Sequence, residues 1–309
     1  MTSINTASRS LVPSDAGLLE STSRYGVGTH PNDRGLPVAR WLTAVMRFPI
    51  GLAASWFVMA IVVMWALFPA LFTSYSGTVG VARQQLRAPS AEHWLGTDAL
   101  GRDLLARVIY GAANSLSGAF VAVGVGLVIG TTLGLLAGSA RGRVDGAIMR
   151  IVDVLLSIPQ LLLSLSIVIL LGFGTVNAAI AVGVTSIASF ARLARSEVVR
   201  VRASDYVEAA FGSGGTFVRV LLRHILPNSL TSVVALAALQ FGSAILAIST
   251  LGFLGYGAPP PTPEWGLLIA EGRNYIARAW WLTTVPGVVV ILVVLSANRI
   301  NQSFGKDRT

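Results

Sequence analysis

Six long apolar segments dominate this chain, and they place most of it in a membrane. A helix of about 20 apolar residues crosses the ~30 Å hydrocarbon core. Because lipid offers no hydrogen-bond partners, such segments satisfy their backbone groups internally. We therefore predict an all-α polytopic membrane protein with six transmembrane helices, at about 49–72, 111–140, 151–172, 176–193, 229–256 and 280–297.

Composition supports this class and excludes several others. The chain is 53% hydrophobic and 12% charged, whereas soluble domains carry about 25% charge. It has no cysteine, which excludes disulfides and thiolate metal sites. Its three histidines, His30, His93 and His224, lack a metal-ligand spacing. The net charge of +9 comes from arginines that flank apolar segments, so we expect no nucleic-acid partner.

The distribution of basic residues predicts the orientation. Most of them fall in the tail and in the loops that share its side of the membrane. By the positive-inside rule both termini are then cytoplasmic, as is the loop 195–228. Residues 1–45 lack apolar periodicity, so we expect a mobile cytoplasmic tail and no signal peptide. The membrane domain is predicted at 46–305, followed by a short tail at 306–309.

The loop between the fourth and fifth segments has the pattern of two short helices. Asp205 can cap the first, with Glu208 three residues on as in a capping box. Gly212, Gly214 and Gly215 end that helix and allow a sharp turn. Pro227 is predicted to stop the second helix before the fifth span. An amphipathic pair of this kind can fill a groove in a partner or rest on the lipid surface.

Glu208–Pro227, which reads EAAFGSGGTFVRVLLRHILP, resembles the EAA loop of permease subunits in bacterial ABC importers. The resemblance implies that the loop docks on a separate ATPase and couples its motion to the membrane. Gly212 and Ser213 depart from the helix formers usual in that family, which weakens the first helix. The coupling residues are then expected to be Asp205, Tyr206, Glu208, Ala209, Ala210, Phe211, Gly214, Arg219, Arg223 and Pro227.

A second block, His93–Leu116, precedes and enters the second span. Physically it is a capped loop, with turn glycines and with Arg102 and Asp103 able to bond within it. It resembles the hallmark of dipeptide, oligopeptide and nickel permeases. The family residues are Gly96, Thr97, Asp98, Gly101, Arg102 and Asp103.

The third block, Pro260–Gly266, resembles the outer loop between the last two helices of the C-type subunit in those systems. Three prolines from Pro259 predict a stiff polyproline II segment. Trp265 and Tyr256 are alternatively interface anchors. The resemblance implies an outer gate or a binding-protein contact at Pro260, Pro261, Pro263, Trp265 and Gly266.

A few polar groups lie within the predicted spans. Asp153 is expected to pair with Arg150 at i−3, and Pro159 is expected to kink the third span. Interhelical hydrogen bonds are the expected use of the remaining polar groups, although a pathway-lining role stays open. These groups are Asn114, Gln160, Asn177 and Gln240.

No phosphate-binding Gly-x-x-x-x-Gly-Lys-Ser/Thr run and no catalytic constellation occur in the sequence. We therefore expect a transport subunit that is not an enzyme and binds no cofactor or metal itself. The resemblance implies a type I ABC importer permease of the bacterial inner (plasma) membrane. Its expected partners are a B-type permease, two ATPase subunits that bind ATP and Mg²⁺, and an extracytoplasmic substrate-binding protein.

The expected cargo is di- or oligopeptides. A nickel complex, a glutathione-like solute or another small solute remains an alternative within the family. A different class is an ion-driven carrier or channel without an ATPase, which should place ionisable residues near the bilayer midplane. A membrane-embedded enzyme would need converging acids or a nucleophile–base pair, which the spans lack.

Overall fold

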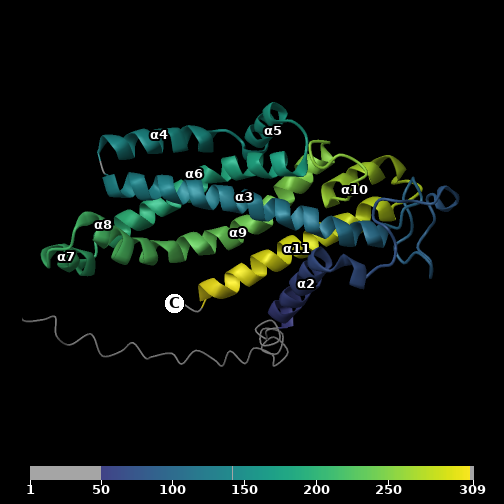
Figure 1. The fold of residues 1–309 in the computed structure, drawn as a ribbon, viewed down its shortest axis with the longest axis horizontal. Coiled ribbons are helices and arrows are strands. Elements are labelled where there is room, and N and C mark those ends of the chain that lie inside the picture. The colour runs from purple at the N-terminus through teal and green to yellow at the C-terminus, as the bar shows by residue number, and fades with distance from the viewer. Residues whose placement is uncertain (1–49, 141, 307–309) are drawn as a thin grey trace, which may run out of the picture. The chain divides into compact units, whose positions relative to one another are not determined.

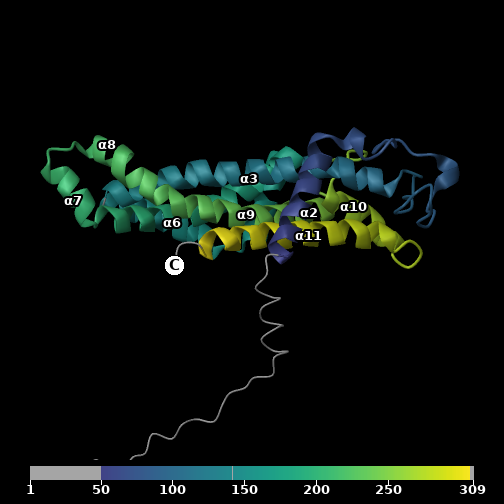
Figure 2. The same ribbon diagram turned by 90° about the horizontal axis from the view of Figure 1, so that it is seen from below.

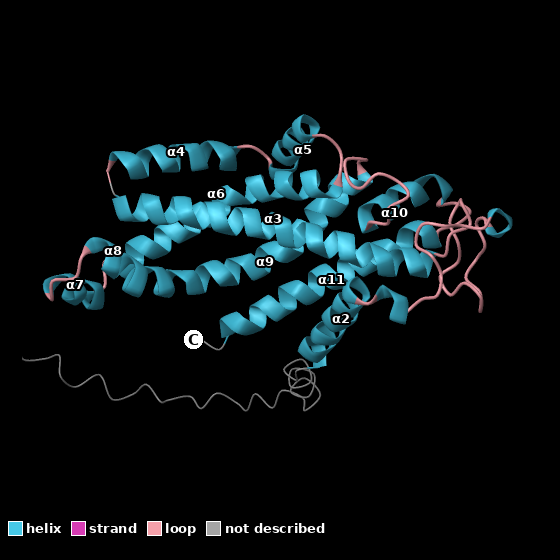
Figure 3. Cartoon of the chain, in the orientation of Figure 1, coloured by secondary structure: helices cyan, strands magenta, loops and turns pink. Residues whose placement is uncertain are grey.

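The computed structural model describes residues 50–140 and 142–306, and these are helical apart from turns and one isolated bridge between Thr97 and Asp103 (Figure 3). The predicted tail at 1–45 lies outside the described residues, as do residues 307–309 of the tail predicted at 306–309, whereas Lys306 is the last residue of a helix. Five helices are long and apolar enough to cross a membrane, or six if one bent pair counts as a single span. The all-α polytopic prediction is thus confirmed.

The bundle is built around α3 (Leu104–Ala140) and α6 (Thr175–Arg202), which pack along much of their length (Figure 1). Glycines recur every four residues on the α3 face that meets α6. At Gly126, Gly130, Gly134 and Gly138, an added Cβ would come within 2.5–2.8 Å of α6 atoms. Because lipid gives helices no hydrophobic reason to associate, close packing of small residues is what holds such a pair.

Three further helices complete the main bundle (Figure 2). α9 (Leu226–Phe253) packs on both α3 and α6, and α11 (Trp281–Lys306) packs on α9. α2 (Ile50–Leu67) lies against α3 and α11. The short α10 (Trp265–Gly272) fits between α9 and α11 at one end of the bundle. It lies close to residues 68–103, here called the coil 68–103, which include two short 3-10 helices, η1 (Pro69–Leu71) and η2 (Ala82–Gln84).

The predicted third span is two helices rather than one kinked helix. α4 (Arg143–Ser157) and α5 (Gln160–Leu171) meet at Pro159 with a 97° bend. Proline prevents the helix from continuing because it lacks an N–H and clashes with the preceding turn. The position of the predicted kink is therefore right, but the kink is a complete break.

The pairing predicted for Asp153 is wrong. Its carboxylate accepts a hydrogen bond from Arg192 of α6 at 2.5 Å rather than from Arg150. A second pair on the same side joins Asp145 to Arg195 at 2.7 Å. Both pairs fasten α4 to α6, so charges on α4 are used between helices rather than along one helix.

Helix ends also differ from the predicted spans. α3 begins at Leu104, seven residues before the predicted position, because Asp103 caps it by accepting from the backbone N–H of Ala106 at 2.7 Å. The final helix continues to Lys306, well beyond the predicted end at 297. Polar or charged side chains at the helix ends, such as Arg107, lower the local hydropathy. The spans predicted from hydropathy are therefore shorter than the helices.

Candidate functional site

Two regions at opposite ends of the bundle contain the residues singled out by sequence (Figure 1). The first, here called the α7–α9 junction, comprises residues 205–227. Its first helix, α7 (Asp205–Gly212), is anchored by Val207, which is fully buried against Val198, Val201 and Val220. The apolar underside of α7 therefore rests on the end of α6.

The predicted capping box is not formed. Ser204 is the N-cap of α7, and its side chain makes no capping bond. The backbone carbonyl of Ser204 instead accepts from the N–H groups of Val207 at 2.9 Å and Glu208 at 3.1 Å. Asp205 and Glu208 are consequently exposed acids in the first turn, where they stabilise the positive end of the helix dipole.

The turn after α7 depends on Gly214. Ser213 is the C-cap, and Gly214 has a φ of +89°, a left-handed conformation that favours glycine. The backbone N–H of Gly215 then bonds back to the carbonyl of Ala210 at 3.1 Å. The glycine-rich sequence thus gives a tight, defined reversal.

Pro227 does not stop the second helix, contrary to prediction. α8 (Phe217–Val220) runs into a π-helical turn, η3 (Leu221–Ile225), and on into α9. Together they form one continuous span from Phe217 to Phe253. Pro227 directly follows the π turn, where the hydrogen-bond ladder of the helix changes register, so its missing N–H falls at an existing irregularity.

The outer surface of the junction is apolar with a charged rim. Tyr206, Phe217, Val218 and Leu222 are 51%, 42%, 62% and 58% exposed. The charged rim includes Glu208, Arg219 and Arg223, and Ala209 is exposed beside Glu208. Tyr206 is held by a hydrogen bond between its hydroxyl and Nδ1 of His224. This fixed apolar surface has the composition of a docking site.

The second region contains an ion cluster formed by Asp98, Arg102, Arg107 and Glu271. Asp98 accepts from Arg102 at 2.6 Å and from Arg107 at 2.8 Å. Glu271 of α10 accepts from the same two arginines at 3.1 and 2.5 Å. Both guanidinium groups are buried, so the cluster joins the coil 68–103, α3 and α10 through charge-assisted bonds.

The residues around Asp98 confirm a compact capped loop. Asp98 also accepts from the backbone N–H groups of Leu100 and Arg102, each at 2.9 Å. Gly96 and Gly101 have φ values of +77° and +73°, as turn residues require. Asp103 bonds His93 within the loop at 2.9 Å, whereas Arg102 also reaches Glu271 outside it.

Thr97 belongs to the same buried structure. Its hydroxyl donates to the backbone carbonyl of Gln84 and accepts from the N–H of Arg87 at 2.9 Å. The family residues of this block thus form hydrogen bonds that hold different parts of the coil 68–103 together. Their observed contacts are structural ones.

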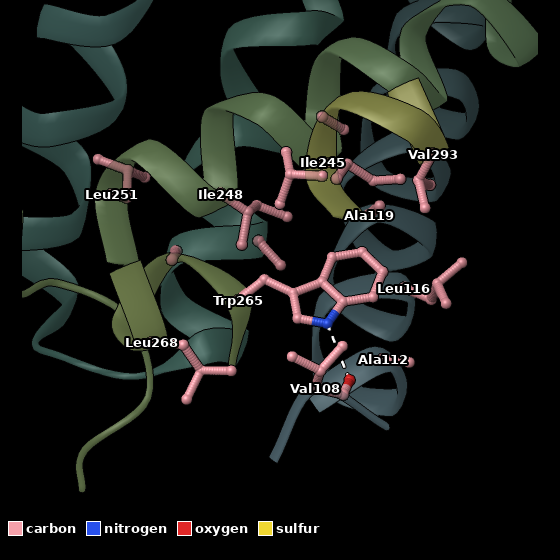
Figure 4. Packing of buried hydrophobic residues seen from close by; sticks show 14 of the residues in the cluster. Val108, Ala112, Leu116, Ala119, Ile245, Ile248, Leu251, Trp265, Leu268 and Val293 are labelled. Atoms are coloured by element: carbon pink, nitrogen blue, oxygen red, sulfur yellow. Dashed lines mark hydrogen bonds between the residues drawn. The ribbon is translucent and has the colours of Figure 1, made fainter. Parts of the chain in front are cut away.

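Trp265 is a core residue, and its predicted role as a membrane-interface anchor is wrong. The side chain is fully buried, and its indole N–H donates to the carbonyl of Val108 at 3.0 Å (Figure 4). It points into α3 and α9, close to Leu116, Ile245 and Ile248 (Figure 4). Tyr256 is half-buried and stacks on Phe173.

Glu264 is a buried carboxylate that the sequence reading did not single out. It caps α10 by accepting from the N–H groups of Gly266 at 2.9 Å and Leu267 at 3.0 Å. Ser115 of α3 donates to the same carboxylate at 3.4 Å. Burial raises the pKa of Glu264 to about 7, against the opposing effect of these hydrogen bonds.

The proline run before Glu264 is a turn and not polyproline II as predicted. The N–H of Thr262 bonds the carbonyl of Pro259 at 3.2 Å. Pro260 and Pro261 are exposed, whereas Pro263 and Gly266 are buried with Trp265. A partner can therefore touch only the first two residues of the predicted contact set directly.

Arg107, Glu264 and Glu271 are the residues that sequence reasoning missed. Glu264 lies inside the Pro260–Gly266 block that the sequence singles out. An acidic residue next to Trp265 in that block could therefore have been recognised as a candidate site residue. The partnership between Arg107 and Glu271 joins residues 164 apart, which no local pattern reveals. Asn114 was predicted to bond between helices, but its amide donates to the carbonyl of Pro263, in the loop before α10, at 2.8 Å.

The apolar helices define a multi-pass membrane protein. Residues 130–308 match the family described as the binding-protein-dependent transport system inner membrane component. The chain belongs to this family, whose members are the inner membrane permease components of ABC importers.

Curated relatives cover most of the chain. A dipeptide transport system permease protein DppC from Alkalihalophilus pseudofirmus is 40% identical over 87% of this chain and 90% of its own length. A di/tripeptide permease from Pseudomonas aeruginosa is 41% identical over 78% and 81%. A glutathione transport system permease GsiD from Pectobacterium atrosepticum is 42% identical over 68% and 70%.

Solved structures agree in fold. An inward-facing MetNI methionine ABC transporter chain aligns with a TM-score of 0.54 and 22% identity, over 65% of this chain and 97% of its own. An amino acid ABC transporter solved with histidines aligns at 0.52 and 17%, over 65% and 94%. At these identities the likeness concerns the fold alone.

Proposed function

We propose that this chain is the C-type permease subunit of an ATP-driven importer for di- or oligopeptides. In the assembly it pairs with a B-type permease, two ATPases that bind ATP and Mg²⁺, and an extracytoplasmic binding protein. The chain itself forms half of the translocation route and hydrolyses nothing. Both termini and the α7–α9 junction are cytoplasmic in this proposal.

The observation that carries the proposal is the exposed apolar surface of the junction. Tyr206, Phe217 and Leu222 lie on short helices that are anchored beneath by Val207 and Val220. An ATPase docked there pushes on α8, which continues without interruption into α9. A displacement at the surface is then transmitted into the membrane bundle because helices are stiff over this length.

Peptide cargo is supported by the names of the relatives, which include dipeptide, di/tripeptide and glutathione permeases. Nickel or another small solute is the alternative within the family. The residues of the ion cluster are bound to one another, so they provide structure at the α10 end in this proposal. Cargo choice then belongs to the binding protein.

The test is uptake of a labelled dipeptide into proteoliposomes holding the four membrane-associated subunits and the loaded binding protein. We expect uptake only with internal ATP and with the binding protein on the outside. Uptake driven by an ion gradient without ATPase subunits would instead identify a carrier. Robust uptake of a nickel complex with no peptide uptake would replace the cargo assignment.

A further inference from the structure

The break between α4 and α5 lies inside the depth of the bundle. α4 and α5 have 15 and 12 residues, about 22 and 18 Å, so neither crosses a ~30 Å core alone. Val152 of α4 packs against Ala188 and Ala191, near the middle of α6. The exposed ion pair Asp153–Arg192 lies at this level and marks the polar edge of the bundle. The break follows six residues later, about 9 Å farther from these charges, so it lies deeper in the membrane than they do.

The break leaves backbone groups without helical partners. The first intrahelical bond of α5 runs from the N–H of Leu163 to the carbonyl of Pro159 at 3.1 Å. Pro159 is the N-cap and its side chain offers no acceptor, so the amides of residues 160–162 lack a capping group. On the α4 side, Ser157 satisfies one carbonyl by donating to Val154 at 2.7 Å.

These groups are not covered by the rest of the described chain. Residues 156–162 are all exposed. In hydrocarbon each unsatisfied backbone group costs several kcal/mol, and irregular backbone at that depth persists only inside protein or beside water. The break therefore requires a polar neighbour that residues 50–140 and 142–306 do not supply.

Two polar side chains, Ser157 and Gln160, lie at the break among exposed apolar ones such as Ile158 and Leu161. Gln160 is exposed, and its amide makes no hydrogen bond within the described residues. Ser157 is exposed on the other side of Pro159. We propose that Ser157–Gln160 lines the aqueous route through which cargo crosses the membrane, an inference that rests on the proposed transport function.

The absence of cysteine makes this directly testable. Single substitutions Ser157→Cys and Gln160→Cys are placed in the assembled complex, whose partners have their own cysteines replaced. The control is Leu170→Cys, on α5 and 86% exposed in the chain. Each complex in proteoliposomes is treated with a membrane-impermeant cationic methanethiosulfonate reagent, without and with ATP and vanadate.

We expect both break cysteines to react at least about tenfold faster than the control, because a thiol in apolar surroundings ionises poorly. Their rates should change with nucleotide, and modification should block uptake. Rates equal to that of Leu170→Cys would overturn the inference. So would protection combined with efficient cross-linking to the partner permease, which would place protein at the break.

The readout is independent of cargo identity. Fast, nucleotide-dependent labelling without peptide uptake would support the aqueous route and reject the peptide assignment. Peptide uptake with unreactive break cysteines would support the peptide assignment and reject an aqueous route at Ser157–Gln160. Co-purification of all subunits with each variant checks that the complex has assembled.

Discussion

Asp98 holds two buried arginines, and its removal should be among the most damaging single changes in the chain. Without it, Glu271 is the remaining acidic partner of Arg102 and Arg107 among the described residues, and breaking a buried pair costs about 3–5 kcal/mol. We expect Asp98→Ala to lower the apparent Tm of the purified complex strongly at a fixed heating rate.

Asp153 provides the matched control, because it pairs with Arg192 while both side chains are more than half exposed. Exposed pairs contribute about 0–1 kcal/mol, so Asp153→Ala should barely change the Tm. Equal shifts for the two variants would show that the ion cluster does not hold the α10 end together.

Glu264 should make stability depend on pH. Its folded pKa is about 7, above its ordinary value, so the folded protein binds the proton more tightly than the unfolded one. Its contribution is then fully present at pH 4 and lost as pH rises through 7. We expect the Tm difference between wild type and Glu264→Gln to change between pH 5 and pH 8.

The direction is the informative part of that measurement. Relative to Glu264→Gln, the wild type should lose stability as pH increases over this interval. Parallel profiles would mean that Glu264 titrates normally. Parallel profiles are also expected if the hydrogen bonds from Gly266 and Leu267 outweigh burial, because the carboxyl then titrates below this interval.

At the scale of elements, the α3–α6 contact depends on glycines that leave no room for a side chain. A Cβ on Gly130 would lie 2.6 Å from the carbonyl oxygen of Ile187 and from Cβ of Phe190. Such overpacking costs about 1–3 kcal/mol. Gly130→Ala should therefore lower the Tm, whereas Gly124→Ala on the same helix, with open space around it, should not.

The turn after α7 offers a second paired comparison. Gly214 has a φ of +89°, so Gly214→Ala strains the backbone by about 1–2 kcal/mol. Gly212 is helical with open space around it, and Gly212→Ala should stabilise α7 by up to about 1 kcal/mol. Hydrogen exchange of the α7 amides should quicken in the first variant and slow in the second.

Hydropathy was sufficient to predict most spanning elements because their apolar length is a local property. It failed at the third span, where Pro159 separates two helices instead of bending one. It also failed at Pro227, since a π turn lets the helix continue from α8 into α9. In both places the outcome depends on how the proline's neighbours pack, which a single sequence window does not contain.

At the scale of the whole molecule, the two ends of the bundle differ in kind. At the α10 end, buried charged groups and Trp265 join α10 to α3. The contacts there are between residues far apart in sequence, such as Arg107 and Glu271. The α7–α9 junction is built from local turns with an open apolar surface. The two short helices and the glycine turn of the junction follow from local sequence patterns, whereas the capping box and the stop at Pro227 were predicted wrongly. The long-range contacts of the opposite end have no local pattern, and only motif resemblance pointed to that region.

The central claim is that an ATPase drives this chain through the α7–α9 junction. The direct test is the ATPase activity of the reconstituted complex, with and without loaded binding protein, in wild type, Glu208→Lys and Gln302→Lys. Both positions are exposed, but only Glu208 lies in the junction. We predict at least about a tenfold loss of stimulation and uptake for Glu208→Lys, as for a central docking residue, and none for Gln302→Lys. Wild-type stimulation and uptake in Glu208→Lys would contradict the account.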